Sequence, residues 1–123
     1  MKTETLELAI RIANALIAEV GVQNWKPDSR VGQHVLIRTY SAGVHFGRLK
    51  FRNGTEATLS DARRIWSWKG ANTLNEIATK GIDQSASNVS QPVPEIDLTN
   101  VIEVIPLSEA ARSNLEGCTW RNK

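Results

Sequence analysis

Arginine and aromatic side chains are concentrated in residues 36–72, together with one of the two histidines of the chain. A guanidinium is a planar fork that can hold a phosphate through two hydrogen bonds, and an aromatic ring can stack on a base. The sequence contains no phosphate-binding glycine loop, no zinc-ligand spacing and no nucleophile motif. These residue types therefore predict a site that binds a nucleotide-like anion without a metal or cofactor.

The first cluster is the stretch RTYSAGVHFG at residues 38–47. Tyr40, Ser41 and His45 could offer hydrogen bonds or a stacking ring, and the glycines of the stretch would let a ligand approach the backbone closely. A hairpin turn that uses glycine for its geometry explains the same residues. His45 by itself is more typical of a hydrogen-bonded histidine than of a catalytic base.

The second cluster is the stretch ARRIWSWKGA at residues 62–71. Alternate side chains of an extended chain share a face, which places Arg64 with Trp66 and Trp68 and leaves Arg63 on the opposite face. A guanidinium beside two indoles would form a platform for a nucleotide. A tryptophan on a strand is more often part of a core or an interface, and Arg64 could equally form a salt bridge.

The candidate ligand-binding residues are the cationic, polar and aromatic members of both clusters: Arg38, Tyr40, Ser41, His45, Arg63, Arg64, Trp66, Trp68 and Lys69. Glu56 and Asp61 lie near the hairpin signal Asn53-Gly54 and could act as a general acid and base, but carboxylates beside such a turn are usually solvated. We therefore expect a binding protein and not an enzyme.

Length and charge limit the possible partners. A chain of 123 residues predicts one domain, residues 1–123. Its formal net charge of +2 is weaker than expected for a protein bound to long nucleic acid, so a small anion suits it better. The single cysteine, Cys118, cannot form an internal disulfide, and no run of about 18 apolar residues occurs. We expect a cytoplasmic protein with no membrane span.

The apolar pattern predicts an α+β fold. Apolar residues at helical spacing from Leu6 to Val20 predict an amphipathic N-terminal helix over residues 4–20, packed on the chain's own small antiparallel sheet or on a second subunit. A β-rich body should follow over residues 33–106. Its expected parts are strands over 33–40, 44–51, 55–59, 62–68 and 95–105, a helix over 73–80 and a polar loop over 82–92. A C-terminal helix over 109–116 and a short edge strand over 118–120 complete the expectation.

The two clusters, a short helix that ends near Lys80-Gly81 and the stretch VPEIDLTNVIEVIP at residues 93–106 resemble the phage anti-Thoeris family of nucleotide sponges. The resemblance covers about half of the chain, and Ser67 and Lys69 depart from the family pattern. Members of that family are small non-enzymatic phage proteins that form homo-oligomers. They bind cyclic ADP-ribose isomers made by bacterial TIR-domain defence proteins and hold them uncleaved, and some bind cyclic oligonucleotides at a separate site.

The resemblance implies a sponge that acts in the cytoplasm of a bacterial host. A diphosphate would be held by Arg38, Arg63 or Arg64, with the base covered by an aromatic ring of either cluster, in a pocket shared by two chains. One alternative is a small β-barrel that binds single-stranded nucleic acid through the same residues. Another is a structural or regulatory phage protein whose tryptophans form an oligomer interface.

Overall fold

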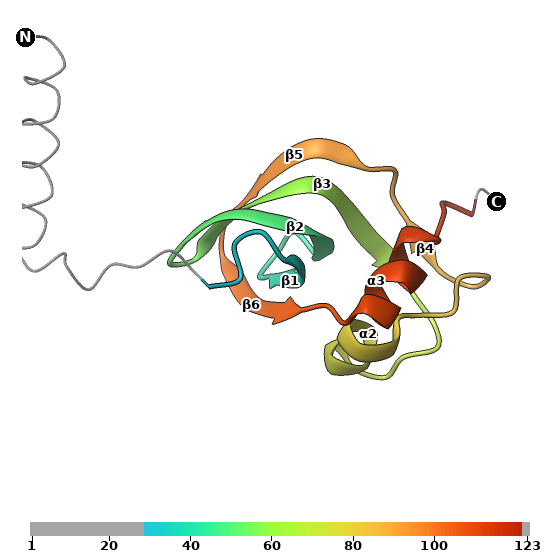
Figure 1. Ribbon diagram of the computed structural model, residues 1–123. Helices are drawn as coiled ribbons and strands as arrows, with labels where there is room; N and C mark the ends of the chain where they lie inside the picture. The colour runs from blue at the N-terminus through green and yellow to red at the C-terminus, as the bar shows by residue number, and fades with distance from the viewer. Residues whose placement is uncertain (1–28, 122–123) are drawn as a thin grey trace, which may run out of the picture.

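The computed structural model describes residues 29–121, and the helix expected over residues 4–20 lies outside them. The described chain forms six strands and two short helices (Figure 1). In chain order the elements are β1 (His34–Thr39), β2 (Val44–Asn53), β3 (Glu56–Ser67), α2 (Leu74–Lys80), β4 (Asn88–Val89), β5 (Val93–Leu98), β6 (Val101–Pro106) and α3 (Glu109–Glu116).

All strand pairs are antiparallel and form one sheet in the order β4-β3-β2-β1-β6, with β5 paired to β3 beside β4. β5 and β6 therefore belong to opposite sides of the sheet, although only residues 99–100 separate them along the chain. The sheet must curl until its two sides meet at this link (Figure 1). Two backbone hydrogen bonds fix the meeting point, from Tyr40 N to Asn100 O at 2.9 Å and from Val101 N to Thr55 O at 2.9 Å.

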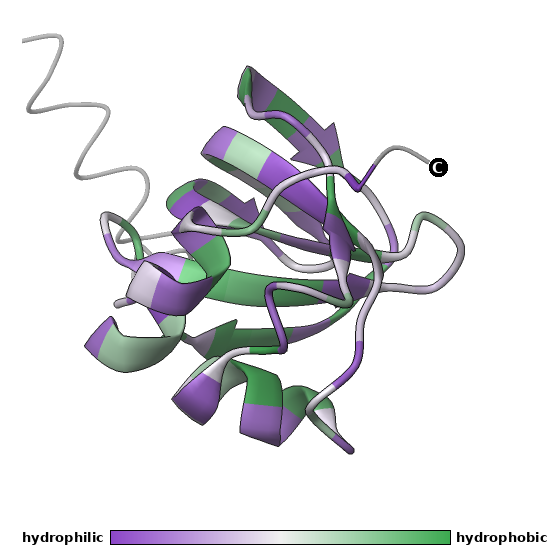
Figure 2. Cartoon of the chain, turned by 90° about the vertical axis from the view of Figure 1, so that its right-hand side faces the viewer, coloured by the Kyte–Doolittle hydropathy of each residue, from purple (hydrophilic) through white to green (hydrophobic). Residues whose placement is uncertain are grey.

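Because the sheet is curled and also covered by helices, β1 is buried on both faces. Val35 and Ile37 point into an inner cluster within the curl, and Leu36 points into an outer cluster between the sheet and the helices. The inner cluster also contains Leu49, Ala57, Leu59, Ala62, Leu98 and Val101, and the outer cluster contains Phe46, Ile65, Ile77, Ala78, Ile82, Val89, Leu115 and Cys118. Figure 2 shows the hydrophobic residues on the central strands and on the helix sides that face them.

Both short helices begin and end where the sequence predicts. The Thr73 side chain accepts a hydrogen bond from Glu76 N at the start of α2, and Gly81, with a φ of 89°, ends it. The Ser108 side chain accepts a hydrogen bond from Ala111 N at the start of α3, and Gly117 ends that helix. The expected bounds of both helices are therefore confirmed to within one residue.

The predicted fold class is wrong. The described chain is mainly a six-stranded antiparallel sheet, and the helices that cover it come from the middle and the end of the sequence. The buried helical residues against the sheet are Ile77 and Ala78 of α2 and Leu115 of α3. Helices this short carry few apolar positions, so the longer pattern of residues 4–20 gave the stronger signal in the sequence.

Four strand predictions also differ from the structure. The strands expected over 55–59 and 62–68 are one strand, β3, which continues through a register irregularity next to Asp61, whose φ is 49°. The single strand expected over 95–105 is divided into β5 and β6 by a turn at Asn100, which adopts a φ of 55°. The loop expected over 82–92 contains the two-residue strand β4. The expected edge strand over 118–120 is represented by one hydrogen bond, from Val89 N to Thr119 O at 3.2 Å.

Gly47 permits the close packing of β2 against the irregular part of β3. A Cβ atom at this position would lie 2.8 Å from Ser60 O and 3.2 Å from Ala62 Cα, both of which are backbone atoms. The close neighbour of this glycine is therefore the chain's own strand, and not a ligand as the sequence suggested.

We predict that Gly47→Ala lowers the free energy of unfolding by about 1–3 kcal/mol, because the new methyl group forces the two strands apart. Urea denaturation would measure the change. Arg48→Ala is the matched control, since Arg48 is the neighbouring exposed strand residue and its loss should cost less than about 0.5 kcal/mol. Equal stability of the two variants would show that the strands can separate at little cost.

Candidate functional site

A groove of about 230 Å³ lies over β3, between β2 on one side and β5 with its preceding connection on the other. Its floor includes Ala62 and Ile96, which also pack in the inner cluster, so the groove is where the inside of the curled sheet opens to solvent. The lining residues are His45, Ala62, Arg63, Arg64, Ser90, Gln91, Val93 and Ile96.

The sheet register brings the two sequence clusters together at this groove. His45 of β2 is the direct partner of Arg64 of β3. Directly opposed residues of an antiparallel pair have Cβ atoms about 4.5–5.5 Å apart, so an imidazole and a guanidinium lie side by side. The two clusters therefore lie on neighbouring strands of the sheet.

Arg64 is half-buried in the groove wall. Its backbone is fixed, because Arg64 N donates to Ser90 Oγ at 2.8 Å and Arg64 O accepts from Ser90 N at 2.9 Å. Within residues 29–121, its guanidinium makes no hydrogen bond or ion pair. A cation of five hydrogen-bond donors is thus held beside the groove with its donors unused in the described part of the chain.

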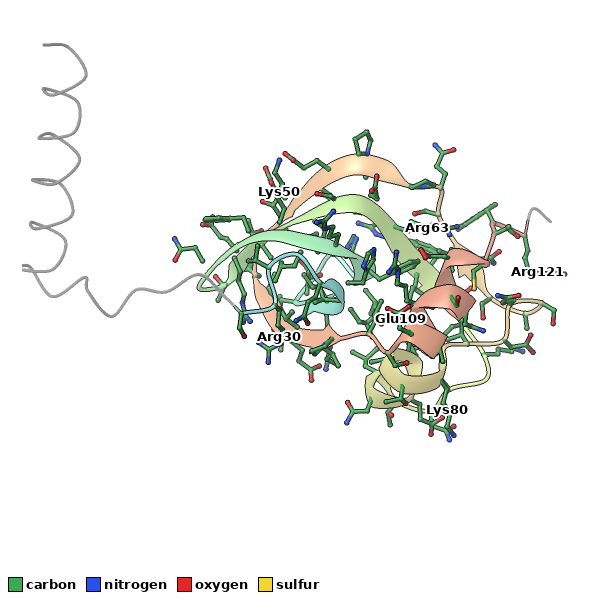
Figure 3. The ribbon with its side chains drawn as sticks, in the orientation of Figure 1. Arg30, Lys50, Arg63, Lys80, Glu109 and Arg121 are labelled. Carbon is green, nitrogen blue, oxygen red and sulfur yellow. The ribbon has the colours of Figure 1, made fainter. Side chains whose placement is uncertain are left out.

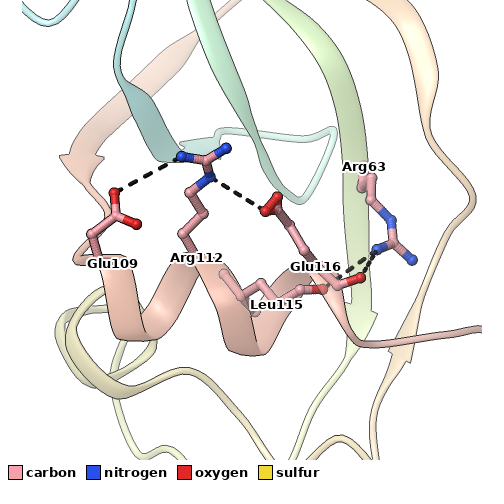
Figure 4. A network of polar contacts seen from close by, with 5 residues as sticks. All are labelled: Arg63, Glu109, Arg112, Leu115 and Glu116. Atoms are coloured by element: carbon pink, nitrogen blue, oxygen red, sulfur yellow. Dashed lines mark hydrogen bonds and ion pairs between the residues drawn. The ribbon is translucent and has the colours of Figure 1, made fainter.

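Arg63, the preceding residue, has the opposite role. Its guanidinium crosses the outer face of the sheet and donates to four carbonyl groups, those of Ser90 at 2.7 Å, Leu115 at 3.4 Å, Glu116 at 3.2 Å and Cys118 at 2.7 Å. Figure 3 shows Arg63 between β3 and the end of α3, and Figure 4 shows its bonds to Leu115 and Glu116.

Arg63 supplies the positive charge that the last turn of α3 lacks. This helix has no basic residue in its last turn, where a cation is favourable, and the Arg63 guanidinium lies at that end. It also lies over the Phe46 ring, 5.8 Å from the centroid. Burial lowers the pKa of Arg63 from its ordinary value. Arg63 is therefore a structural residue, although it borders the groove.

His45 is 1% exposed and closes the turn between β1 and β2. Its Nε2 donates to Ala42 O at 2.9 Å, and Thr39 Oγ1 holds the same turn by accepting from Ala42 N and donating to Gly43 O. Burial lowers the pKa of His45, the Ala42 bond raises it in part, and the neighbouring Arg64 lowers it further. His45 is therefore neutral at pH 7.

The tryptophans of β3 separate. Trp66 follows Arg64 by two residues on the strand, so the two side chains project to the same face about 6.5–7 Å apart, and Trp66 is 65% exposed. Trp68 lies past the end of β3 and packs against the outer hydrophobic cluster. The prediction that both tryptophans share a face with Arg64 is therefore wrong for Trp68.

The remaining candidates lie outside the groove. Arg38 forms an exposed ion pair with Glu103 at 3.4 Å. Tyr40 is 80% exposed, and Ser41 is exposed in the β1–β2 turn. Lys69 has an exposed side chain, and its backbone donates to Ser87 Oγ and accepts from Asp83 N.

Sequence reasoning missed the wall formed by Ser90, Gln91, Val93 and Ile96. Ser90 is bonded to the backbone of Arg64 in β3 through both its hydroxyl and its own backbone. Val93 of β5 lies directly opposite Ala62 of β3. The sequence signal for this wall was weak. The polar stretch 82–92 precedes a strand, which indicates a connecting segment but does not show that the segment lies beside β3.

Two further properties of residues 29–121 were determined. No three histidine, cysteine, aspartate or glutamate side chains of this part are grouped to hold a metal ion. Neither α2 nor α3 has the length and hydropathy that would allow it to cross a membrane.

Comparison with known proteins gives one family match. The family model described as "Domain of unknown function (DUF6948)" matches residues 32–115, which include every described strand and α2 and nearly all of α3. No curated protein and no solved structure matches the chain.

The adjacent arginines provide a direct test of their different roles. We predict that Arg63→Met lowers the free energy of unfolding by about 2–3 kcal/mol, because four carbonyl groups lose a charged donor. Arg64→Met is the matched control and should change stability by less than about 0.5 kcal/mol. Denaturant titration of both variants checks this, and a larger loss for Arg64→Met would reverse the assignment.

Proposed function

The chain belongs to this family of domains of unknown function, so its activity has to be inferred from its own residues, and we propose that it binds a nucleotide without catalysis. In this proposal the phosphate binds Arg64 and the base stacks on Trp66. The groove beside His45 holds the part of the ligand between them.

The observation that carries the proposal is the difference between Arg63 and Arg64. Arg63 donates to four carbonyl groups, whereas the Arg64 guanidinium has no partner within residues 29–121 although it is half-buried. A phosphate would accept charge-assisted hydrogen bonds from these unused donors. An exposed indole two residues away on the same face supports a ligand that also contains a flat ring.

The size of the groove supports a shared site. Pockets that bury a whole drug-sized ligand usually have volumes of about 300–1,000 Å³. A groove of about 230 Å³ holds only part of a dinucleotide, such as a sugar and one phosphate. We therefore propose that a second copy of the chain covers the rest, with the exposed Trp66 near the boundary.

The specific ligand we propose is a cyclic ADP-ribose isomer, bound and kept intact in the cytoplasm of a bacterial host. This part of the proposal comes from the resemblance of residues 38–47, 62–71 and 93–106 to the anti-Thoeris sponges. Such a ligand contains a diphosphate and one base, adenine, which the Arg64 and Trp66 arrangement suits. A sponge requires tight binding and no turnover.

We predict that cyclic ADP-ribose isomers bind the purified protein and that Arg64→Met weakens binding by about 10- to 100-fold, because charged hydrogen bonds to phosphate are lost. Calorimetric titration measures the affinity, and quenching of tryptophan fluorescence reports the stacking. Lys69→Met is the matched control, since it removes an exposed cation outside the groove and should leave the affinity unchanged.

The same sample distinguishes a sponge from an enzyme. After heat denaturation, the ligand should be recovered chemically unchanged. A converted ligand would contradict the non-enzymatic part of the proposal. If no isomer binds at micromolar concentration, the sponge proposal is wrong.

Single-stranded nucleic acid is the second candidate, and the exposure of Trp66 and Tyr40 favours it, because open rings can stack successive bases. Salt separates the two candidates. Binding of a strand should weaken steeply between 50 and 200 mM salt through the release of several counterions, about one for each phosphate contacted. Binding of one small nucleotide should change by only a fewfold. A steep salt dependence with an oligonucleotide, and no binding of the small nucleotide, would favour the strand.

A further inference from the structure

The hydrogen bond to the Ala42 carbonyl fixes which nitrogen of His45 carries a proton. A carbonyl oxygen only accepts, so Nε2, at 2.9 Å from it, must donate. His45 is buried and neutral at pH 7, so its single ring proton is on Nε2. Nδ1 is consequently a hydrogen-bond acceptor.

His45 Nδ1 is an unpaired acceptor in the described part of the chain. His45 is one of the groove residues, and its Nδ1 makes no hydrogen bond with any residue in the range 29–121. Within that range, the one fully buried side-chain nitrogen without a hydrogen-bond partner is Nε of Arg112, so Nδ1 of His45 is not fully buried. Nδ1 is therefore an acceptor without a partner in residues 29–121, on a side chain that borders the groove.

The groove thus combines a cation with a neutral acceptor at directly opposed positions of β2 and β3. Arg64 attracts an anion, and Nδ1 of His45 requires a donor such as a hydroxyl group. Ala62, Val93 and Ile96 supply an apolar wall that suits the carbon face of a sugar. An ionised phosphate oxygen only accepts hydrogen bonds and could not pair with this acceptor.

We infer that the groove selects the ribose phosphate part of a ribonucleotide, with a ribose hydroxyl donating to His45 Nδ1 while the phosphate binds Arg64. This inference rests on the proposed nucleotide-binding function and adds the sugar that the site accepts. His45 is then a specificity-determining residue, because a deoxyribose lacks the donor that its acceptor needs. Its bond to Ala42 orients the ring for this role.

The test compares AMP, 2′-deoxy-AMP and 3′-deoxy-AMP by titration of the full-length wild-type protein. At least one deoxy analogue should bind about five- to tenfold more weakly than AMP, as expected for one lost hydrogen bond. If both analogues bind as tightly as AMP, the inference is overturned while the proposed function stands. If AMP does not bind, the inference is also overturned, and the titration with cyclic ADP-ribose isomers decides the proposed function separately.

Two substitutions identify His45 as the source of the discrimination. His45→Gln keeps an acceptor and a donor for Ala42 and should retain part of the preference for AMP. His45→Phe keeps a ring without an acceptor and should bind all three nucleotides equally. Melting curves check that both variants fold. If His45→Phe does not fold, the comparison of the three nucleotides on the wild-type protein still decides the inference. A folded His45→Phe that still discriminates as the wild type does would overturn the role of His45.

Discussion

The guanidinium of Arg63 is the interaction on which the arrangement of the groove depends. It joins β3, the connection before β5 and the end of α3, three segments that are far apart along the chain. The bond to Ser90 O holds the groove wall against β3. The bonds to Leu115 O and Glu116 O, drawn in Figure 4, and the bond to Cys118 O hold α3 over the sheet. Loss of this cation would loosen the helix and the wall together, since both use the same side chain.

The alternation of a β-strand then gives the next residue a different role. Arg63 points to the outer face, which the helices cover, and Arg64 points to the groove. Two arginines with adjacent positions and the same chemistry therefore have separate tasks, one in stability and one, as we propose, in ligand binding. A one-residue slip in the register of β3 would exchange them, so the register shared by His45 and Arg64 is a functional requirement of the proposed site.

The curl of the sheet explains why a groove exists at all. The link at residues 99–100 brings β5 and β6 together, and the inner cluster fills most of the space inside. Near His45 and Arg64 the side chains that line the inside of the curled sheet change from aliphatic to polar, and this part of the interior opens to solvent as the groove. Gly47 and the irregularity beside Asp61 allow β2 and β3 to bend this far. A flat sheet made from the same residues would place His45 and Arg64 on an open surface.

The sequence by itself determined the local features: the hairpin signalled by Asn53-Gly54 between β2 and β3, and the ends of α2 and α3. Turns and caps depend on side chains that bond within four residues, so their signals are local. The tertiary structure decided which helices cover the sheet, that β3 is continuous, and that Arg63 is structural while Arg64 faces the groove. The role of Arg63, for example, depends on Ser90 and Glu116, which lie 27 and 53 residues from it. No local pattern specifies a partner at that distance, because the contact forms only when the sheet curls and α3 packs against it.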